Sequence, residues 1–259
     1  MPRASRHYLP GHIWHLTHRC HRRQFLLKFL KDRRVWIDWL YTASKRFGLC
    51  VLDYTVTSNH VHLIVRDRGR GEIARSMQLI AGRTGQQFNE RKQRRGAFWE
   101  DRYHATAIES GEHLARCLTY VDLNMVRAGV TAHPAQWHTC GYHEIQRPPR
   151  RLAIIDRQAL AESVHVSLVD LAARHAEWIA DALACRSTAR VRQWSTSIAV
   201  GSRGFVEAVE GDLHSRANGR ELQPFDAVAG AFVLREACTR YGYALGGKKE
   251  RGDRKWATP

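Results

Sequence analysis

The chain has 259 residues, 44% of them hydrophobic, so it can bury the core of one large domain, with or without an appendage. Its 41 Lys and Arg residues against 25 Asp and Glu residues give a formal charge of +16, which predicts a polyanionic partner such as nucleic acid. There is no apolar run of about 18 residues and no apolar signal-peptide core near the N-terminus. The six scattered cysteines favour reduced thiols. We therefore expect a cytoplasmic, nucleoid-associated protein without a membrane partner.

The first six predicted elements follow the order β, α, β, β, α, β. Alternating or continuous apolar residues predict the strands, and apolar residues three and four apart predict the helices. Gly48 ends the first helix, and Ser58-Asn59 joins two strands as a hairpin. The expected ranges are 12–17, 32–47, 49–57, 60–66, 73–88 and 105–108. This order is typical of an α+β, ferredoxin-like antiparallel sheet with both helices on one face and the other face available to a ligand.

Two histidines stand two positions apart in the apolar strand expected at 60–66. Side chains of a strand alternate, so His60 and His62 lie on one face while Val61 and Leu63 lie on the other. Neutral imidazole is a common metal ligand, and two on one face can bind a single cation. Taken alone, a His-x-His pair is more often an ordinary amphipathic strand, so further residues must decide.

A third helix is expected from Ser110 or Gly111 to about residue 126, ending before Gly129. Tyr120 and Asn124 are four residues apart and therefore lie on one face of it, at the edge of the apolar stripe. They are placed to reach a neighbouring strand. A boundary tyrosine that only packs its ring is the simpler interpretation of Tyr120 alone.

Three ordered blocks resemble a known family. Asn59-His60-Val61-His62-Leu63 is similar to the HUH motif of single-tyrosine transposases. The block Phe-Trp-Glu-Asp-Arg-Tyr at 98–103 and the block Tyr-Val-Asp-Leu-Asn-Met-Val-Arg-Ala-Gly at 120–129 resemble REP-associated tyrosine transposases. The resemblance covers roughly residues 2–142. The segment 194–202 also resembles an extension of some members, to which we attach no function. In one departure, Asn124 is followed by Met125 where the family usually has proline.

The resemblance implies roles for four residues. His60, His62 and Asn124 would be ligands of a divalent metal, Mg²⁺ or Mn²⁺, and Tyr120 would be the nucleophile. An ordinary tyrosine hydroxyl is only about 0.1% ionised at pH 7, so a neighbouring cation is needed to stabilise the developing charge. Tyr103 is a rival nucleophile, although its position between Arg102 and His104 favours a packing or DNA-contacting ring.

Basic residues outside the motif are candidates for contact with DNA phosphates. They come from the loop after the first strand, from the basic run after the second helix, and from the second and third of these blocks. We expect DNA contacts from Arg22, Arg23, Lys92, Arg94, Arg95, Arg102 and Arg127. A zinc site at His18, Cys20 and His21 is a weaker alternative, because the spacing does not match that of structural zinc sites.

The chain is expected to divide into four parts. Residues 1–145 would form the HUH nuclease domain, and residues 146–152, with two consecutive prolines, a linker. Residues 153–245 would form a small helical appendage of unknown role, with helices starting near Ser167 and Ser202. It could pack against the domain, form a homodimer or bind DNA. Residues 246–259 would form a basic flexible tail.

The expected function is that of a metal-dependent single-strand DNA endonuclease and strand transferase. Its partner would be single-stranded or hairpin DNA, at repetitive extragenic (REP) sequences. A covalent tyrosine link would conserve the energy of the broken bond, and no P-loop pattern occurs in the sequence. The alternatives are a non-catalytic DNA-binding regulator with the same fold and, more remotely, a metallohydrolase of small molecules.

Overall fold

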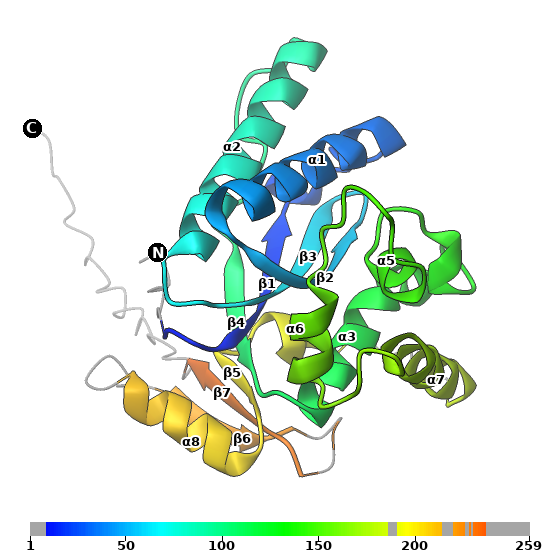
Figure 1. The fold of residues 1–259 in the computed structure, drawn as a ribbon. Coiled ribbons are helices and arrows are strands. Elements are labelled where there is room, and N and C mark those ends of the chain that lie inside the picture. Colours follow the sequence, from blue (N-terminus) through cyan, green and yellow to red (C-terminus); the bar gives the residue numbers. More distant parts are fainter. Residues whose placement is uncertain (1–8, 186–190, 214–219, 226–227, 229, 237–259) are drawn as a thin grey trace, which may run out of the picture.

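The computed structural model describes residues 9–185, 191–213, 220–225, 228 and 230–236 (Figure 1). The basic tail expected at 246–259 lies outside the described residues. Among the described residues, no helix is long and apolar enough to cross a membrane.

The N-terminal half contains the six predicted elements in the predicted order. Helix α1 ends where Gly48 adopts a left-handed conformation with φ of 71°, as expected from its glycine. Asp32 does not cap α1, because the helix begins two residues before it; its buried carboxylate instead pairs with Arg91 of α2. The elements are β1 (Ile13–Arg19), α1 (Leu30–Phe47), β2 (Cys50–Val56), β3 (His60–Arg66), α2 (Glu72–Lys92) and β4 (His104–Ile108).

The first four strands form an antiparallel sheet in the order β2-β3-β1-β4. β3 therefore lies between its hairpin partner β2 and the first strand β1. In this register Thr17 is opposite His62, Arg19 is opposite His60, and His15 is opposite Thr106 of β4. The predicted α+β class and ferredoxin-like arrangement are confirmed.

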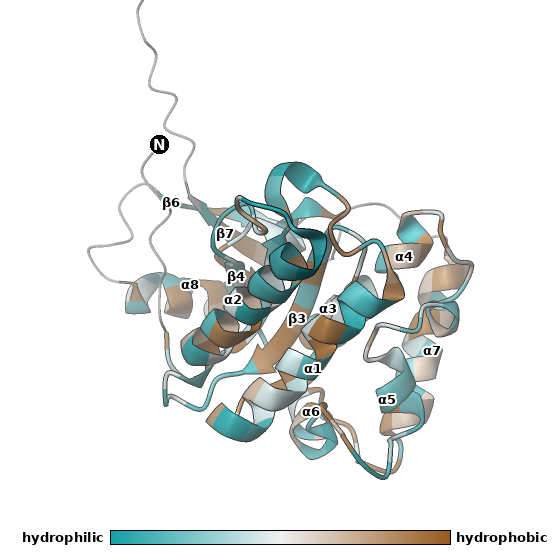
Figure 2. Cartoon of the chain, turned by 90° about the horizontal axis from the view of Figure 1, so that it is seen from above, coloured by the Kyte–Doolittle hydropathy of each residue, from teal (hydrophilic) through white to brown (hydrophobic). Residues whose placement is uncertain are grey.

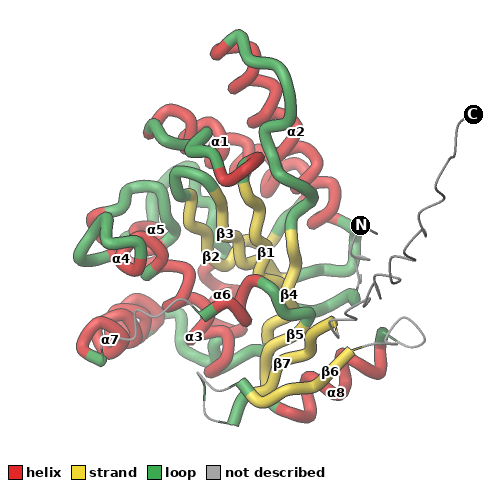
Figure 3. Tube along the Cα trace, turned by 180° about the vertical axis from the view of Figure 1, so that it is seen from behind, coloured by secondary structure: helices red, strands yellow, loops and turns green. Residues whose placement is uncertain are grey.

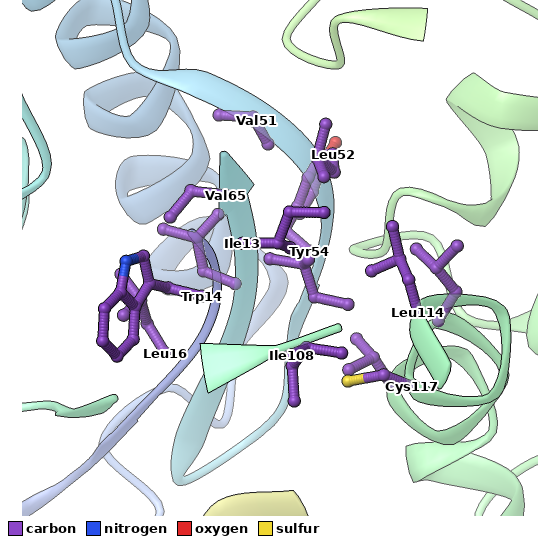
Figure 4. Packing of buried hydrophobic residues seen from close by; sticks show 14 of the residues in the cluster. Ile13, Trp14, Leu16, Val51, Leu52, Tyr54, Val65, Ile108, Leu114 and Cys117 are labelled. Carbon is purple, nitrogen blue, oxygen red and sulfur yellow. The ribbon is translucent and has the colours of Figure 1, made fainter. Parts of the chain in front are cut away.

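The two faces of the sheet carry different layers of the core. Helices α1 and α2 lie side by side over one face, and Figure 2 shows the apolar strand β3 between them, while their outward sides are largely hydrophilic. Helix α3 (Glu112–Asp122) packs on the other face. In Figure 4, Leu114 and Cys117 of α3 lie on the side of Ile108, whereas Trp14 and Leu16 point away from α3. Alternate side chains of β1 therefore pack into the two different layers of the core.

The C-terminal part contains strands as well as helices. Strands β5 (Ala199–Gly201), β6 (Arg220–Pro224) and β7 (Phe232–Glu236) extend the sheet to seven strands in the order β2-β3-β1-β4-β5-β7-β6 (Figure 3). β5 pairs in parallel with β4, with Ala107 opposite Ala199. The region expected to be a helical appendage therefore also continues the sheet of the N-terminal domain. Its strands are short: β5 pairs with the distant strands β4 and β7, and β6 pairs with β7.

The helices of this part surround α3 and the added strands. α8 begins after Ser202, near the expected start, and the Ser202 hydroxyl caps the helix by accepting from the backbone N–H of Phe205. α7 begins later than expected, because Ser167 and Asp170 bond to each other in the turn before the helix. The remaining helices are α4 (Asn124–Arg127), α5 (Tyr142–Gln146), α6 (Arg157–Ser163), α7 (Leu171–Ala184), α8 (Arg203–Asp212), and the 3₁₀ turns His21–Arg23, Pro134–Gln136 and Arg192–Ser195.

Candidate active site

His60, His62 and Asn124 converge at one point on the face of the sheet that α3 covers. The Nδ2 atom of Asn124 lies 2.9 Å from Nε2 of His62 and 3.4 Å from Nε2 of His60. The amide can also present its oxygen by a half-turn about its Cβ–Cγ bond, because its two ends have nearly the same shape. Two imidazole nitrogens and an amide oxygen are donors that a divalent cation can use.

The backbone brings these three side chains together from two elements. β3 places both histidines on one face through its alternation. The helix that carries Asn124 is interrupted at Leu123, whose ψ of 8° separates α3 from α4. Buried Asp122 of α3 holds this end in place, since its Oδ2 atom lies 2.8 Å from Nε2 of His175 on α7. The C-terminal helices thus help to position Asn124.

The inner nitrogens of the two histidines are hydrogen-bonded away from the convergence point. Nδ1 of His60 faces Oδ1 of Asn59 at 2.7 Å and Oγ1 of Thr57 at 2.9 Å. Nδ1 of His62 lies 2.8 Å from Nε2 of His15. Metal-binding histidines in proteins are usually oriented by such a second bond. Both Nε2 atoms therefore remain directed at Asn124.

Burial keeps His62 and His15 neutral. It lowers the pKa of His62 well below 6.5, and the nearby His60 and His15 act in the same direction. Burial likewise lowers the pKa of His15 to about 4, against the opposing effect of its bond to the Trp194 carbonyl. A neutral imidazole retains the lone pair that a metal needs.

Tyr120 lies beside this cluster with its side chain largely buried. Its ring centre is 6.0 Å from that of His62, and the guanidinium carbon of Arg127 lies 4.0 Å from the Tyr120 ring centre. On another side the Trp194 ring lies 6.3 Å away. Tyr103, the rival tyrosine, instead lies 6.5 Å from the ring of His18, which is stacked on Trp99.

The predicted DNA-binding residues occupy two locations. Arg127 lies at Tyr120 itself. Arg22 and Arg23 lie in the turn after β1, where the carbonyl of Arg23 accepts from the side-chain amide of Asn59, next to His60. The end of α2 reaches the same end of the sheet, since the Lys92 ammonium lies 5.5 Å from the Phe29 ring centre.

The other three predicted residues differ in their availability. The guanidinium of Arg94 bonds the Asn89 side chain and the Ala97 carbonyl, so it organises the loop after α2. Arg95 is exposed in that loop, and Arg102 is exposed near the start of β4.

The zinc alternative is not supported within the described ranges. There, no group of three or more His, Cys, Asp or Glu side chains is placed to hold a metal ion. Burial raises the pKa of the Cys20 thiol to about 12, whereas zinc binds the thiolate.

Two features of the site were not predicted from the sequence. These are the contact of His15 with His62 and the approach of Trp194 to Tyr120. The alternation of β1 already placed His15 opposite to Trp14 and Leu16, and the ferredoxin-like order makes β1 a neighbour of β3. Those two facts together could have predicted the first contact. No local pattern predicts the second.

Comparison with known proteins places this geometry in a family context. Residues 9–124, which include His15, His60, His62, Tyr120 and Asn124, match the family model described as “Transposase IS200 like”. This stretch is similar to IS200-like transposases. The predicted family resemblance is thereby confirmed, and the family supports a role in DNA transposition with DNA as the partner. Arg127 and Trp194 lie outside the matched stretch.

The chain is also similar to solved structures. One is described as “Structure of the REP associates tyrosine transposase bound to a REP hairpin”; the match has 18% identity and a TM-score of 0.48, and covers 60% of this chain and 94% of that chain. Another is a “putative transposase from deinococcus radiodurans r1”, with 17% identity, a TM-score of 0.33, and coverage of 44% and 90%. Comparison with curated proteins gave no match.

Proposed function

We propose that the protein is a metal-dependent single-strand DNA endonuclease and strand transferase that acts through Tyr120. The observation that carries this proposal is the convergence of both Nε2 atoms on Asn124, with the Tyr120 ring 6.0 Å from the ring of His62. The Tyr120 ring and the candidate metal site are therefore neighbours. The formal charge of +16 favours DNA as the substrate.

Each residue would have a defined role. Held by His60, His62 and Asn124, Mg²⁺ or Mn²⁺ would act as a Lewis acid on the scissile phosphate. The Tyr120 oxygen would attack phosphorus and lose its proton to solvent as the bond to the 3′ oxygen breaks. This would leave a 5′-phosphotyrosine and a free 3′-hydroxyl. Attack by the 3′-hydroxyl of another strand would rejoin the DNA and release Tyr120, so that no external energy source is needed.

The substrate that we propose is single-stranded DNA folded into a hairpin, as at repetitive extragenic sequences. This follows the resemblance of the motif blocks to REP-associated tyrosine transposases. A folded strand presents both duplex phosphates and unpaired bases, which allows the protein to select its site by shape as well as by sequence.

The decisive experiment is a search for the covalent intermediate. Labelled single strands that carry a hairpin are incubated with the protein and Mn²⁺ or Mg²⁺, and adducts are separated on a denaturing gel. We expect an adduct with the wild type and with Tyr103→Phe, and none with Tyr120→Phe, which should still bind the DNA. An adduct that persists in Tyr120→Phe would refute the assigned nucleophile. Binding by the wild type without any adduct would favour a non-catalytic regulator.

A further inference from the structure

A chain of hydrogen bonds connects the C-terminal part of the protein to His62. Nδ1 of His15 lies 2.7 Å from the backbone carbonyl oxygen of Trp194, and Nε2 of His15 lies 2.8 Å from Nδ1 of His62. Nε2 of His62 in turn faces Asn124 at 2.9 Å. We infer that His15 is a positioning residue that fixes the tautomer of His62, and that the segment around Trp194 takes part in the site by holding His15.

The direction of each bond follows from the first acceptor. A carbonyl oxygen can only accept, so Nδ1 of His15 carries the proton. A neutral imidazole has one N–H group, so Nε2 of His15 is an acceptor, and Nδ1 of His62 must donate to it. Nε2 of His62 is then left with its lone pair directed at Asn124. The tautomer required of a metal ligand is therefore set by a backbone carbonyl 179 residues from His15.

His60 obtains the same tautomer from its own hairpin. The hydroxyl of Thr57 donates to the His60 carbonyl at 2.7 Å, so its oxygen is available to accept from Nδ1 of His60 at 2.9 Å. Oδ1 of Asn59 is a second acceptor at 2.7 Å. The two histidines thus differ: His60 depends on two neighbouring residues, Thr57 and Asn59, whereas His62 depends on β1 and on the C-terminal part.

The carbonyl of Trp194 is held in place by its surroundings. The Trp194 side chain is only 3% exposed, and its ring packs edge-on against Phe225 at 5.2 Å between centres. Three residues further on, the carbonyl of Ser197 accepts from the hydroxyl of Thr106 at 2.7 Å. The segment cannot drift from the sheet without losing these contacts, so the acceptor for His15 is fixed. Trp194 lies outside residues 9–124, so this part of the site is an addition to the matched domain.

The first experiment reads the tautomer directly in protein without metal. Protein labelled with ¹⁵N-histidine is studied by long-range ¹H–¹⁵N correlation spectroscopy, and the His62 signals are assigned by their loss in His62→Ala. We expect His62 to carry its proton on Nδ1 in the wild type. We expect that preference to be lost in His15→Leu and kept in His15→Gln, whose amide can donate to the Trp194 carbonyl and accept from His62. A wild-type proton on Nε2 of His62 would overturn the inference.

The second experiment measures the affinity for Mn²⁺ alone by calorimetry. Loss of an outer-shell partner typically weakens metal binding about 10- to 100-fold, which we expect for His15→Leu. His15→Gln should recover most of that loss. His104→Leu is the matched control, because His104 bonds a different carbonyl of this segment, that of Ser197 at 3.0 Å. Equal losses in both His15 variants, or none in His15→Leu, would overturn the inference.

The inference rests on the proposed metal site, so the experiments must distinguish a failure of the metal site from a failure of the role assigned to His15. Unchanged Mn²⁺ affinity in His62→Ala would refute the metal site, and the wild-type tautomer spectrum would then decide the role of His15 without it. If His62→Ala loses Mn²⁺ while His15→Leu keeps it, the metal site stands and the role of His15 falls. Should His15→Leu fail to fold, the wild-type spectrum and the affinity of His15→Gln still test the inference.

Discussion

The guanidinium carbon of Arg127 lies 4.0 Å from the centre of the Tyr120 ring. A cation at this position can stabilise the negative charge that develops on the phenol oxygen and on the attacked phosphate. Arg127 was predicted only as a phosphate contact, and the geometry places it at Tyr120, the proposed nucleophile. Its main effect should therefore be on the rate of the covalent step.

The first prediction concerns Arg127→Gln. We expect the rate of adduct formation at saturating DNA to fall by roughly 10²-fold, the loss typical of removing one electrostatic contact to a transition state. The measurement is single-turnover kinetics of the covalent adduct. Arg116→Gln is the control, since Arg116 lies on the preceding helix, α3, and pairs with Glu112. A loss in DNA affinity with an unchanged rate would assign Arg127 to binding alone.

The second prediction concerns Asn124→Leu. The substitution keeps a similar volume but removes the proposed third ligand, so the affinity for Mn²⁺ should fall by at least about tenfold, as it does when even an outer-shell partner is lost. Calorimetry on DNA-free protein measures this directly. Asn124→Asp supplies an oxygen ligand with a charge and should retain binding. Equal affinity of wild type and Asn124→Leu would show that the amide is not a ligand.

The elements around the site were predictable because their signals are local. The spacing of His60 and His62 in a strand, and of Tyr120 and Asn124 in a helix, determines the face on which each pair lies. The order of the six N-terminal elements then determines which strand flanks β3. Glycines and polar turns marked the ends of these elements to within a few residues.

The C-terminal part could not be predicted in the same way, because its first strand, β5, depends on distant partners. β5 has only three residues, and it is a strand because it pairs with β4 on one side and β7 on the other. Such a segment has no periodicity of its own. The role of Trp194 is equally hidden, because its contact to His15 uses a backbone carbonyl that every residue possesses. Only the folded chain brings this carbonyl to His15.

The third prediction concerns pH and the buried carboxylate of Asp53 on β2. Burial raises the pKa of Asp53 well above 3.8, and the neighbouring Asp122 and Glu144 raise it further. Between pH 3.8, the pKa of an aspartate in the unfolded chain, and the raised pKa of the folded state, Asp53 is therefore protonated in the folded protein and ionised in the unfolded protein. Its stabilising contribution is complete below pH 3.8 and is lost as the pH rises through the folded-state pKa.

Asp53→Asn should remove this dependence. At pH 8 the variant should melt at a higher temperature than the wild type, by roughly 2–4 °C for each kcal/mol recovered, and the difference should shrink toward pH 4. Circular dichroism melts across this range test it. Asp38→Asn, at an exposed position of α1, should show no such trend. A wild type that becomes more stable relative to Asp53→Asn with rising pH would contradict the assignment.

The last prediction concerns the basic residues at the end of the sheet where His60 lies. Three segments meet there: the N–H of Cys20 donates to the Asn59 carbonyl, and the N–H of His21 donates to the Phe98 carbonyl, each at 2.8 Å. The loop after α2, which includes Arg95, thus adjoins the turn that contains Arg22 and Arg23. DNA held at this end would place its phosphates near the candidate metal site.

Lys92→Gln combined with Arg95→Gln should weaken binding of hairpin DNA and make it less sensitive to salt. Each phosphate contact contributes about 0.7 to 0.9 to the slope of log affinity against log salt, so losing two should reduce the slope by roughly 1.4 to 1.8. The control pair is Arg174→Gln with Arg203→Gln, exposed residues of α7 and α8 that remove the same charge elsewhere. Fluorescence anisotropy across a salt series measures both. Equal changes in the two pairs would show that only total charge matters, because a defined contact surface must respond more strongly to its own residues.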